Sequence, residues 1–389
     1  MKQGWEYKKL GEVCEVVTGT TPRTNIPEYW GKGHYWVTPA ELTDTTVYVD
    51  KTERQITDEA LDKTKLRLLP IGTVLLSSRA PIGKVAITDA EMYCNQGFKN
   101  CICSDSINNK YLFYFLRLKK DFLNSLGRGA TFKEISKSIV ENIKLPLPPK
   151  STQLAIVSEL DKINELIRLK KEQLKDFDNL AQSIFYEMFG DPVENEMGWE
   201  VKKLGDSIKV IGGYAFCSKN FLKSGIPVLR IGNINTGKFT PTNMVYWQKD
   251  KGLSRYRILP GDLVISLTGT VGKSDYGNVC ILGNDYEEYY LNQRNAKLEV
   301  GSNLNKYFLT YLLKQDMIRK KLTGINRGVR QANIANRDIE NLNIPLPPLP
   351  LQHLFAQRIE QIEHQKAEVQ KAIADLETLL ASRMQYWFE

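Results

Sequence analysis

The chain has 389 residues, of which 42% are hydrophobic and 25% are charged, and it carries a formal net charge of +8. These values are ordinary for globular proteins, and the length exceeds what one hydrophobic core usually supports, so two or more domains are expected. The sequence contains no run of about 18 apolar residues and no apolar signal region at its N-terminus, so we expect no membrane partner and a cytoplasmic protein.

Cysteine and histidine offer little material for a metal site. The six cysteines stand at positions 14, 94, 101, 103, 217 and 280, without a Cys-x-x-Cys pair, and there are only three histidines. In a reducing compartment this pattern is typical of buried free thiols. We therefore expect no metal ion and no cofactor.

The first globular segment opens with WEYKKLG at residues 5–11. A turn-then-strand pattern follows at 69–77, and a small-residue loop lies at 78–84. At 109–116, apolar side chains recur at helical spacing, beginning with Asn109, a residue type suited to capping a helix. The segment is therefore expected to be α+β, with strands first and helices behind them.

A proline-rich exit, IKLPLPP at residues 143–149, leads into a long run with apolar side chains in the alternating four-and-three steps of a heptad. A helix of about 38 residues would be on the order of 57 Å long, which is typical of a spacer. The expected seam positions of this helix are Leu160, Ile163, Ile167, Leu174, Phe177 and Ile184.

The whole arrangement then repeats. WEVKKLG returns at 199–205, 194 residues after the first copy, and the exit returns as IPLPP at 344–348. The second heptad run has expected seam positions Ile359, Ile362, Val369, Ile373, Leu376 and Leu380. A repeat of this size predicts globular domains rather than short solenoid units. The predicted divisions are globular domains at 1–150 and 191–349 and long helices at 151–190 and 350–389.

If the two long helices pair, they must run antiparallel, because each leaves one domain and ends at the other. The result would be an antiparallel coiled coil with pseudo-two-fold symmetry. Two positions interrupt the seam pattern: Lys170 stands where the second helix has Val369, and Arg383 stands where the first has Ile184. The alternative that the sequence leaves open is that the runs are amphipathic core helices of one large domain.

The net positive charge of the chain lies in the globular segments. Residues 151–189 contain 5 Lys/Arg and 7 Asp/Glu, and residues 350–389 contain 4 and 6, so the remainder of the chain carries +12. Basic domains on slightly acidic helices indicate that the domains bind a polyanion.

No catalytic constellation is found. TGTVGKS at residues 268–274 resembles part of a phosphate-binding P-loop, but Leu267 stands where the pattern needs its first glycine. The Glu-x-Lys pieces at 6–8 and 200–202 lack the partner aspartate of a metal-dependent nuclease site. Two alternatives stay open: a nucleic-acid enzyme with an unrecognised metal-dependent active site, and a coiled-coil scaffold for acidic proteins.

Loops that combine small residues, hydroxyls, amides and cations occur at matching places in both copies. Arginine and lysine side chains bind guanine edges, asparagine and glutamine bind adenine, and hydroxyls bind phosphates. The candidate DNA-binding residues of the first domain are Thr20, Thr21, Arg79, Lys84, Gln96, Arg128, Thr131 and Lys133. Those of the second domain are Arg230, Thr268, Lys273, Gln293, Arg294, Arg327 and Arg330.

The two Trp-x-x-Lys-Lys-Leu-Gly openings, the two Pro-Leu-Pro-Pro exits followed by Gln153 and Gln352, and the two long helices together resemble the DNA-specificity subunit of type I restriction-modification systems. The resemblance implies two target-recognition domains, each reading one half of a bipartite site in double-stranded DNA, with the coiled coil fixing the gap.

The same resemblance implies two methyltransferase subunits and, in the full complex, two restriction subunits as partners. Catalysis would belong to those partners, so the chain itself is expected not to be an enzyme. Because the recognition segments diverge between the copies, the two half-sites are expected to differ in sequence.

Overall fold

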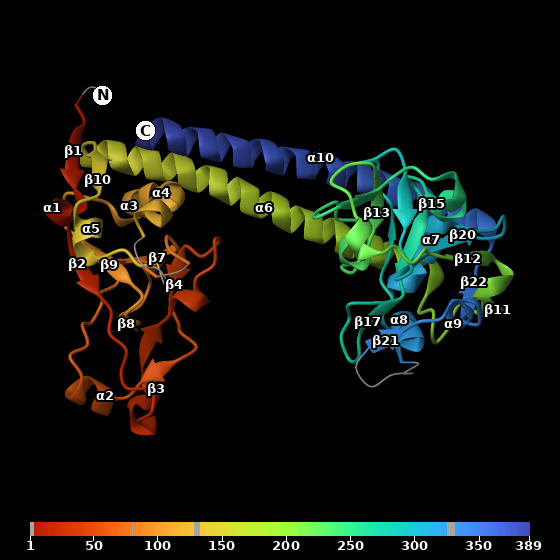
Figure 1. The fold of residues 1–389 in the computed structure, drawn as a ribbon, viewed down its shortest axis with the longest axis horizontal. Coiled ribbons are helices and arrows are strands. Elements are labelled where there is room, and N and C mark those ends of the chain that lie inside the picture. Colours follow the sequence, from red (N-terminus) through yellow and green to blue (C-terminus); the bar gives the residue numbers. More distant parts are fainter. Residues whose placement is uncertain (1–3, 80, 128–132, 325–330) are drawn as a thin grey trace. The chain divides into compact units, whose positions relative to one another are not determined.

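The computed structural model describes residues 4–79, 81–127, 133–324 and 331–389 (Figure 1). The chain divides into two compact units. Unit 1 comprises Met1–Lys171 and Lys371–Glu389, and unit 2 comprises Glu172–Gln370. Each unit therefore contains one globular segment together with one end of each long helix.

Unit 1 contains a five-stranded sheet, a three-stranded sheet and a two-stranded ribbon. Its strands are β1 (Glu6–Lys9), β2 (Cys14–Thr18), β3 (Trp30–Val37), β4 (Tyr48–Val49), β5 (Gln55–Ile56), β6 (Val74–Leu76), β7 (Val85–Thr88), β8 (Tyr93–Cys94), β9 (Lys99–Cys103) and β10 (Lys144–Leu147). Its shorter helices are α1 (Leu10–Val13), α2 (Asp58–Lys63), α3 (Asn109–Leu118), α4 (Lys120–Leu126) and α5 (Lys137–Glu141). The strand orders are β2-β9-β6-β7-β4, β5-β3-β8 and β1-β10.

The opening and exit motifs of unit 1 form one antiparallel ribbon, because β1 pairs with β10 and Glu6 faces Leu147. Leu10, which follows β1, is fully buried. The hydroxyl of Tyr111 on α3 donates to the carbonyl oxygen of Pro146 at 2.7 Å, so α3 is fixed against the exit strand. This ribbon explains why the two motifs occur together in the sequence.

The cap of α3 differs from the expectation. Asn108, not Asn109, caps this helix, and its side-chain oxygen accepts from the backbone N–H of Tyr111 at 3.1 Å. Asn109 instead donates through its side-chain amide to the carbonyl oxygen of Gly72 at 3.2 Å. Two adjacent asparagines suit a cap equally well in sequence, and tertiary contacts decide between them.

Unit 2 contains two four-stranded sheets and two two-stranded ribbons. Its strands are β11 (Glu200–Lys203), β12 (Ile208–Gly212), β13 (Ile226–Leu229), β14 (Val245–Trp247), β15 (Arg257–Ile258), β16 (Leu263–Ser266), β17 (Thr268–Thr270), β18 (Val279–Ile281), β19 (Tyr289–Leu291), β20 (Asn295–Val300), β21 (Gln331–Asn333) and β22 (Asn343–Leu346). Its shorter helices are α7 (Lys306–Lys314), α8 (Asp316–Thr323) and α9 (Asn336–Glu340). The strand orders are β12-β20-β16-β18, β14-β13-β19-β15, β17-β21 and β11-β22.

Short 3-10 helices lie at Pro27–Tyr29, Pro39–Glu41, Leu204–Asp206, Ser218–Asn220, Ile231–Asn233 and Lys251–Tyr256. Unit 2 repeats the scaffold of unit 1: β11 pairs with β22 as β1 pairs with β10. Asn305 caps α7 by accepting from the backbone N–H of Tyr307 at 2.8 Å. The fold class is therefore α+β in both units.

The long helices are α6 (Lys150–Phe189) and α10 (Leu349–Phe388), each of 40 residues. One buried glutamine fixes the start of each. The side chain of Gln153 accepts from the backbone N–H of Asn108 at 2.8 Å and donates to Pro148 at 2.9 Å. Gln352 makes the same pair of bonds, with Asn305 and Pro347, both at 2.8 Å. Both glutamines are fully buried, so each helix is bonded to its own globular segment.

Within each unit, the two long helices pair antiparallel. In unit 1, the start of α6 lies beside the end of α10 (Figure 1), and Trp387 donates to the Glu159 carboxylate at 3.0 Å. In unit 2, Lys366 of α10 bonds Asp178 of α6 at 2.8 Å. Partner numbers on α10 fall as numbers on α6 rise, which is the expected direction of the pair.

Each helix ends in the core of the opposite globular segment. Phe388, at the end of α10, is buried in unit 1 with its ring 5.0 Å from that of Tyr111. Phe189, at the end of α6, is buried in unit 2 with its ring 4.8 Å from that of Phe308. A helix that starts in one core and ends in another is not a core helix of a single large domain.

The seam residues proposed from the heptads are all buried or half-buried. Leu160, Ile163, Ile167, Ile359, Ile362, Val369 and Ile373 are buried, and Leu174, Phe177, Ile184, Leu376 and Leu380 are half-buried. The pattern missed Phe185, which is fully buried against Phe355. No helix among the described residues is long and apolar enough to cross a membrane.

Candidate nucleic-acid interface

Two loops of unit 1, residues 18–22 and 94–97, are held side by side and carry three of the proposed DNA contacts. The backbone N–H of Thr20 donates to the carbonyl oxygen of Cys94 at 2.9 Å. The side-chain amide of Asn95 donates to the Thr21 hydroxyl at 3.3 Å. A side chain at Gly19 would collide with the backbone of Asn95, so glycine is needed for this approach. Gln96 is exposed at the tip of this loop pair.

Arg79 lies beside the same loop pair and is held by a carboxylate. Its Nε donates to Oε2 of Glu134 at 2.9 Å, and its side chain is 44% exposed. The other carboxylate oxygen of Glu134 accepts from the ammonium of Lys99 at 3.1 Å. Burial of Glu134 acts to raise its pKa, but the hydrogen bonds and charges of Lys99 and Arg79 outweigh burial and hold the pKa below its usual value.

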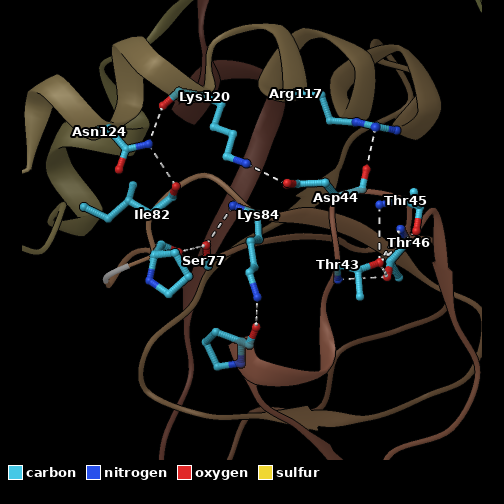
Figure 2. Close-up of polar contacts among 12 residues, drawn as sticks. Thr43, Asp44, Thr45, Thr46, Ser77, Ile82, Lys84, Arg117, Lys120 and Asn124 are labelled. Atoms are coloured by element: carbon cyan, nitrogen blue, oxygen red, sulfur yellow. Dashed lines mark hydrogen bonds and ion pairs between the residues drawn. The ribbon is translucent and has the colours of Figure 1, made fainter. Parts of the chain in front are cut away.

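Lys84 is engaged inside unit 1. Its ammonium donates to the carbonyl oxygen of Pro39 at 3.0 Å, and its backbone N–H donates to the Ser77 hydroxyl at 2.8 Å (Figure 2). Nearby, the ammonium of Lys120 binds the Asp44 carboxylate at 2.6 Å, and the guanidinium of Arg117 donates to the backbone carbonyl oxygen of Asp44 at 2.6 Å (Figure 2). Lys84 therefore fixes the loop before β7. Lys133, in contrast, is exposed.

Unit 2 repeats the loop pair at residues 212–214 and 291–294. The backbone N–H of Tyr214 donates to Leu291 at 2.8 Å, and that of Gln293 donates to Tyr214 at 2.9 Å. A side chain at Gly213 would collide with the backbone of Asn292, as at the matching glycine of unit 1. Gln293 and the neighbouring Arg294 are exposed.

A cavity of about 540 Å³ lies beside this second loop pair. Its lining brings together the proposed contacts Arg230, Gln293 and Arg294. Arg230 donates through a terminal nitrogen to the carbonyl oxygen of Asn243 at 2.6 Å, while its Nε is buried with no hydrogen-bond partner among the described residues. The guanidinium and amide groups of this lining are hydrogen-bond donors, and the bases and phosphates of nucleic acids offer matching acceptors.

The segment that resembled a P-loop is a strand followed by a turn. Thr268 begins β17, and the turn is closed by Asp275, whose carboxylate accepts from the backbone N–H of Thr270 at 2.9 Å and its hydroxyl at 3.0 Å. Lys273 is exposed in the turn. Four proposed contacts, Arg128, Thr131, Arg327 and Arg330, lie outside the described residues.

The helix seam contains a buried cation that the heptad analysis did not identify. Lys366 is 8% exposed. It stands 199 positions after Ile167 and so occupies the heptad position in α10 that Ile167 occupies in α6. Its ammonium binds Asp178 at 2.8 Å and Glu363 at 2.7 Å. Asp178 also binds Lys238 at 2.9 Å, so a loop of unit 2 is bonded to α6.

The two departures noted in the seam have different environments. Arg383 pairs with Glu159 across the helices in unit 1, and its guanidinium lies 4.7 Å from the ring centre of Tyr386. The side chain of Arg383 is about one-third exposed, so solvent reaches this part of the helix seam. Lys170 is half-buried.

The part of the chain that the structure describes offers no metal centre. Among the described residues, no group of three or more His, Cys, Asp or Glu side chains is arranged to hold a metal ion. All six cysteines are free, but Cys217 is exposed, so the expectation of burial is wrong for that thiol. Cys217 follows Phe216 in an irregular segment, where an apolar neighbour does not imply burial.

Sequence reasoning missed Glu134, Lys99 and Lys366. None of the three was singled out from the sequence, because each has a partner that is distant in sequence or lies on another element. The signal present in the sequence is Glu134 itself, a single acidic residue directly after the basic segment 127–133. A carboxylate among cations is a candidate for holding one of them in place.

The family model of the type I restriction modification DNA specificity domain matches residues 2–176 and again residues 196–378. The MjaIX specificity subunit of a type I restriction enzyme from Methanocaldococcus jannaschii is 29% identical, over 96% of this chain and 90% of the relative. The MjaVIII specificity subunit from the same organism is 28% identical, over 97% and 92%.

Solved structures share the fold. A chain from a study of complex assembly and conformational transition of the type I R-M system has a TM-score of 0.62 at 21% identity, covering 99% of this chain and 97% of that one. The S subunit of a type I restriction-modification system from M. genitalium has a TM-score of 0.54 at 14% identity, covering 99% and 96%. Since the family model matches both copies of the repeat and most of the sequence, this chain belongs to the family of type I restriction modification DNA specificity domains.

Proposed function

We propose that this chain is the sequence-specific DNA-binding subunit of a type I restriction-modification complex. In this proposal, residues 1–150 and 191–349 are target-recognition domains, and each reads one half of a bipartite site in double-stranded DNA. The long helices, at 151–190 and 350–389, hold the two readers at a fixed spacing. The specificity subunits from Methanocaldococcus jannaschii, which match nearly the whole chain, support this function.

The observation that carries the proposal is a scaffold used twice with different exposed side chains. The two-stranded ribbon, the buried glutamine and the hydrogen-bonded loop pair occur in both units. On the loop pairs, however, unit 1 exposes Gln96 beside Arg79, whereas unit 2 exposes Gln293 and Arg294 beside a cavity. A repeated scaffold with divergent exposed polar groups is what two readers of different half-sites require.

We assign DNA contact to polar groups that the structure leaves exposed or half-buried. The exposed ones are Arg79, Gln96 and Lys133 in unit 1 and Lys273, Gln293 and Arg294 in unit 2, and the half-buried ones are Thr20, Thr21, Arg230 and Thr268. Lys84 contributes by fixing a loop, because its ammonium is already bonded to Pro39. The excess positive charge of the globular segments supplies attraction to the DNA backbone.

The proposed partners are two methyltransferase subunits, carried by the helices, and two restriction subunits in the full complex. Catalysis belongs to these subunits, and the assembly works in the cytoplasm. The mass of the purified complex tests the stoichiometry: two methyltransferase subunits for each copy of this chain are expected, and a one-to-one complex would contradict it.

Methylation mapping tests the function directly. A host that carries the chain with its methyltransferase partner is sequenced with detection of modified bases, and a host that carries the partner alone is the control. We expect one bipartite motif with two different halves and a constant gap. A contiguous motif, or the same motif in the control, would contradict the proposal.

The alternative of a nucleic-acid enzyme finds no support in the relatives, which are specificity subunits. A cleavage assay on the isolated chain with divalent metal ions separates the two functions. We expect no cleavage from the chain alone.

A further inference from the structure

An isolated β-bridge in unit 1 and the strand pair β17–β21 in unit 2 lie at matching places next to the loop pairs, with matching backbone hydrogen bonds and different side chains. In unit 1, the backbone N–H of Ser78 donates to Gly97 at 2.7 Å, and that of Ile135 donates to Ser78 at 2.9 Å. In unit 2, Leu267 and Ile334 make the two matching bonds, both at 2.8 Å. Arg79 facing Glu134 in unit 1 therefore corresponds to Thr268 facing Asn333 in unit 2.

The arginine of this pair is held in a way that leaves its outer edge available. The Nε of Arg79 is bonded to Glu134 at 2.9 Å, and its terminal nitrogens have no hydrogen bond to any residue that the structure describes. A guanidinium held at Nε still presents two parallel N–H groups. That pair matches the O6 and N7 acceptors of guanine in the major groove.

The carboxylate that holds Arg79 is itself anchored by a buried cation. Lys99 is only 5% exposed, and its ammonium bonds Glu134 at 3.1 Å and the Ser78 hydroxyl at 3.3 Å. Burying an ammonium group is costly unless a carboxylate pairs with it. Both oxygens of Glu134 are therefore occupied, one by the anchor and one by Arg79, which fixes the carboxylate in one orientation.

The fold does not require this anchor. Thr18 of β2 faces Lys99 of β9 in unit 1, and the matching pair in unit 2 is Gly212 with Ala296. Ala296 is fully buried, and the sheet around it has the same pairing. Unit 2 forms the same ladder without a cation, so the ladder itself does not depend on a Lys–Glu pair at this position.

We propose that Arg79 reads a guanine in the half-site bound by unit 1, and that Glu134 and Lys99 are positioning residues that aim its guanidinium. This inference rests on the proposed function as a DNA-recognition subunit. Unit 2 has no guanidinium at the matching position, so its half-site is read there by other groups.

The test uses the full chain with its methyltransferase subunits and measures methylation rates on duplexes that differ from the wild-type motif by one base pair at a time. We expect Arg79→Ala to reduce discrimination at one G·C pair, in one half of the motif, by about 5- to 150-fold. Arg79→Lys should cause a smaller loss at the same base pair, because an ammonium can bind guanine but lacks the two parallel N–H groups of the guanidinium. Discrimination in the other half should be unchanged.

The positioning residues are tested by the same readout. We expect Glu134→Gln to reduce discrimination at that same base pair by a smaller factor. The double variant Lys99→Met with Glu134→Gln should show the same loss as Glu134→Gln alone, because Lys99 acts through Glu134. Arg67→Ala is the matched control, since Arg67 is an exposed arginine of unit 1 paired with Glu15 at 3.2 Å.

Three outcomes would overturn the inference: discrimination that survives in both Arg79 variants, a uniform loss on all sequences as for a phosphate contact, or a loss in both halves. Thermal melting identifies a variant that fails to fold, and Arg79→Lys, which keeps the charge, then carries the test. If methylation mapping of the wild-type complex finds no bipartite motif, the proposed function itself is wrong. If the motif is bipartite but both Arg79 variants keep their discrimination, only the assignment of Arg79 is wrong.

Discussion

The contacts that fix the starts and ends of the two long helices are nearly the same in both units, whereas the side chains beside the two loop pairs differ. Gln153 and Gln352 satisfy the same two backbone groups in their units, and Phe388 and Phe189 fill the same place in the opposite cores. The matching bridged positions carry arginine and glutamate in unit 1 and threonine and asparagine in unit 2. The comparison separates residues that build the scaffold from residues that distinguish the half-sites.

The largest effect is expected from the aromatic anchors. Phe189→Ala should cost about 3–5 kcal/mol of unfolding free energy, because the ring lies in a buried cluster with Phe185, Phe308 and Phe355. Phe388→Ala should cost a similar amount in unit 1. Urea denaturation measures both, with Leu180→Ala, at a 47% exposed position, as the control. A cost below about 1 kcal/mol at either phenylalanine would show that its helix end is not anchored.

The buried glutamines come next. Gln352→Leu should cost about 2–6 kcal/mol, because it leaves the N–H of Asn305 and the carbonyl of Pro347 without partners, at about 1–3 kcal/mol each. Gln153→Leu should cost at least as much, because Gln153 also donates to Ser106 at 3.0 Å. Thermal unfolding compares the two with Gln365→Leu, which changes an exposed glutamine of α10. Equal stability of Gln352→Leu and that control would contradict the shared role.

The seam cation gives a smaller, pH-dependent effect. Lys366→Ile, which copies Ile167, should cost about 1 kcal/mol at neutral pH, because Asp178 is partly exposed and keeps Lys238. Burial acts to raise the pKa of Asp178, but Lys366 and Lys238 hold it below its ordinary value of 3.8. The stability from this carboxylate is therefore complete above that value and is lost as pH falls below it.

Urea denaturation at a series of pH values checks this sign. The difference between wild type and Lys366→Ile should shrink as pH falls below about 3.8. A difference that stays constant to lower pH would mean that Lys366 acts through packing alone.

The smallest effect is expected at the exposed pair between the helices. Lys171 binds Glu377 at 2.7 Å, with both side chains more than half exposed. Lys171→Ala should cost no more than about 0.5 kcal/mol, and less at high salt. Denaturation at two salt concentrations tests this, and a loss above about 1 kcal/mol would show a coupling that the exposure does not suggest.

The sequence was sufficient for the repeat, the direction of the helices and the α+β class, because these depend on regular periodicity and on chain connectivity. It was not sufficient for the details that depend on distant partners. Lys84 turns inward because Pro39, 45 positions away, offers a carbonyl oxygen. Glu134 meets Arg79 only through a strand bridge across 55 positions. The heptad periodicity also could not show that Lys366 is buried. Its burial depends on Asp178 of the facing helix, and the periodicity of one helix does not reveal which residue faces it.

The central claim is that two readers share one scaffold and are spaced by the helix pair. Deleting residues 170–176 together with 369–375 removes one heptad from each helix, about 10 Å of length, which equals about three base pairs of duplex. Methylation mapping should return the same two half-sites with a gap shortened by up to about three base pairs. The original motif with its original gap would contradict the claim.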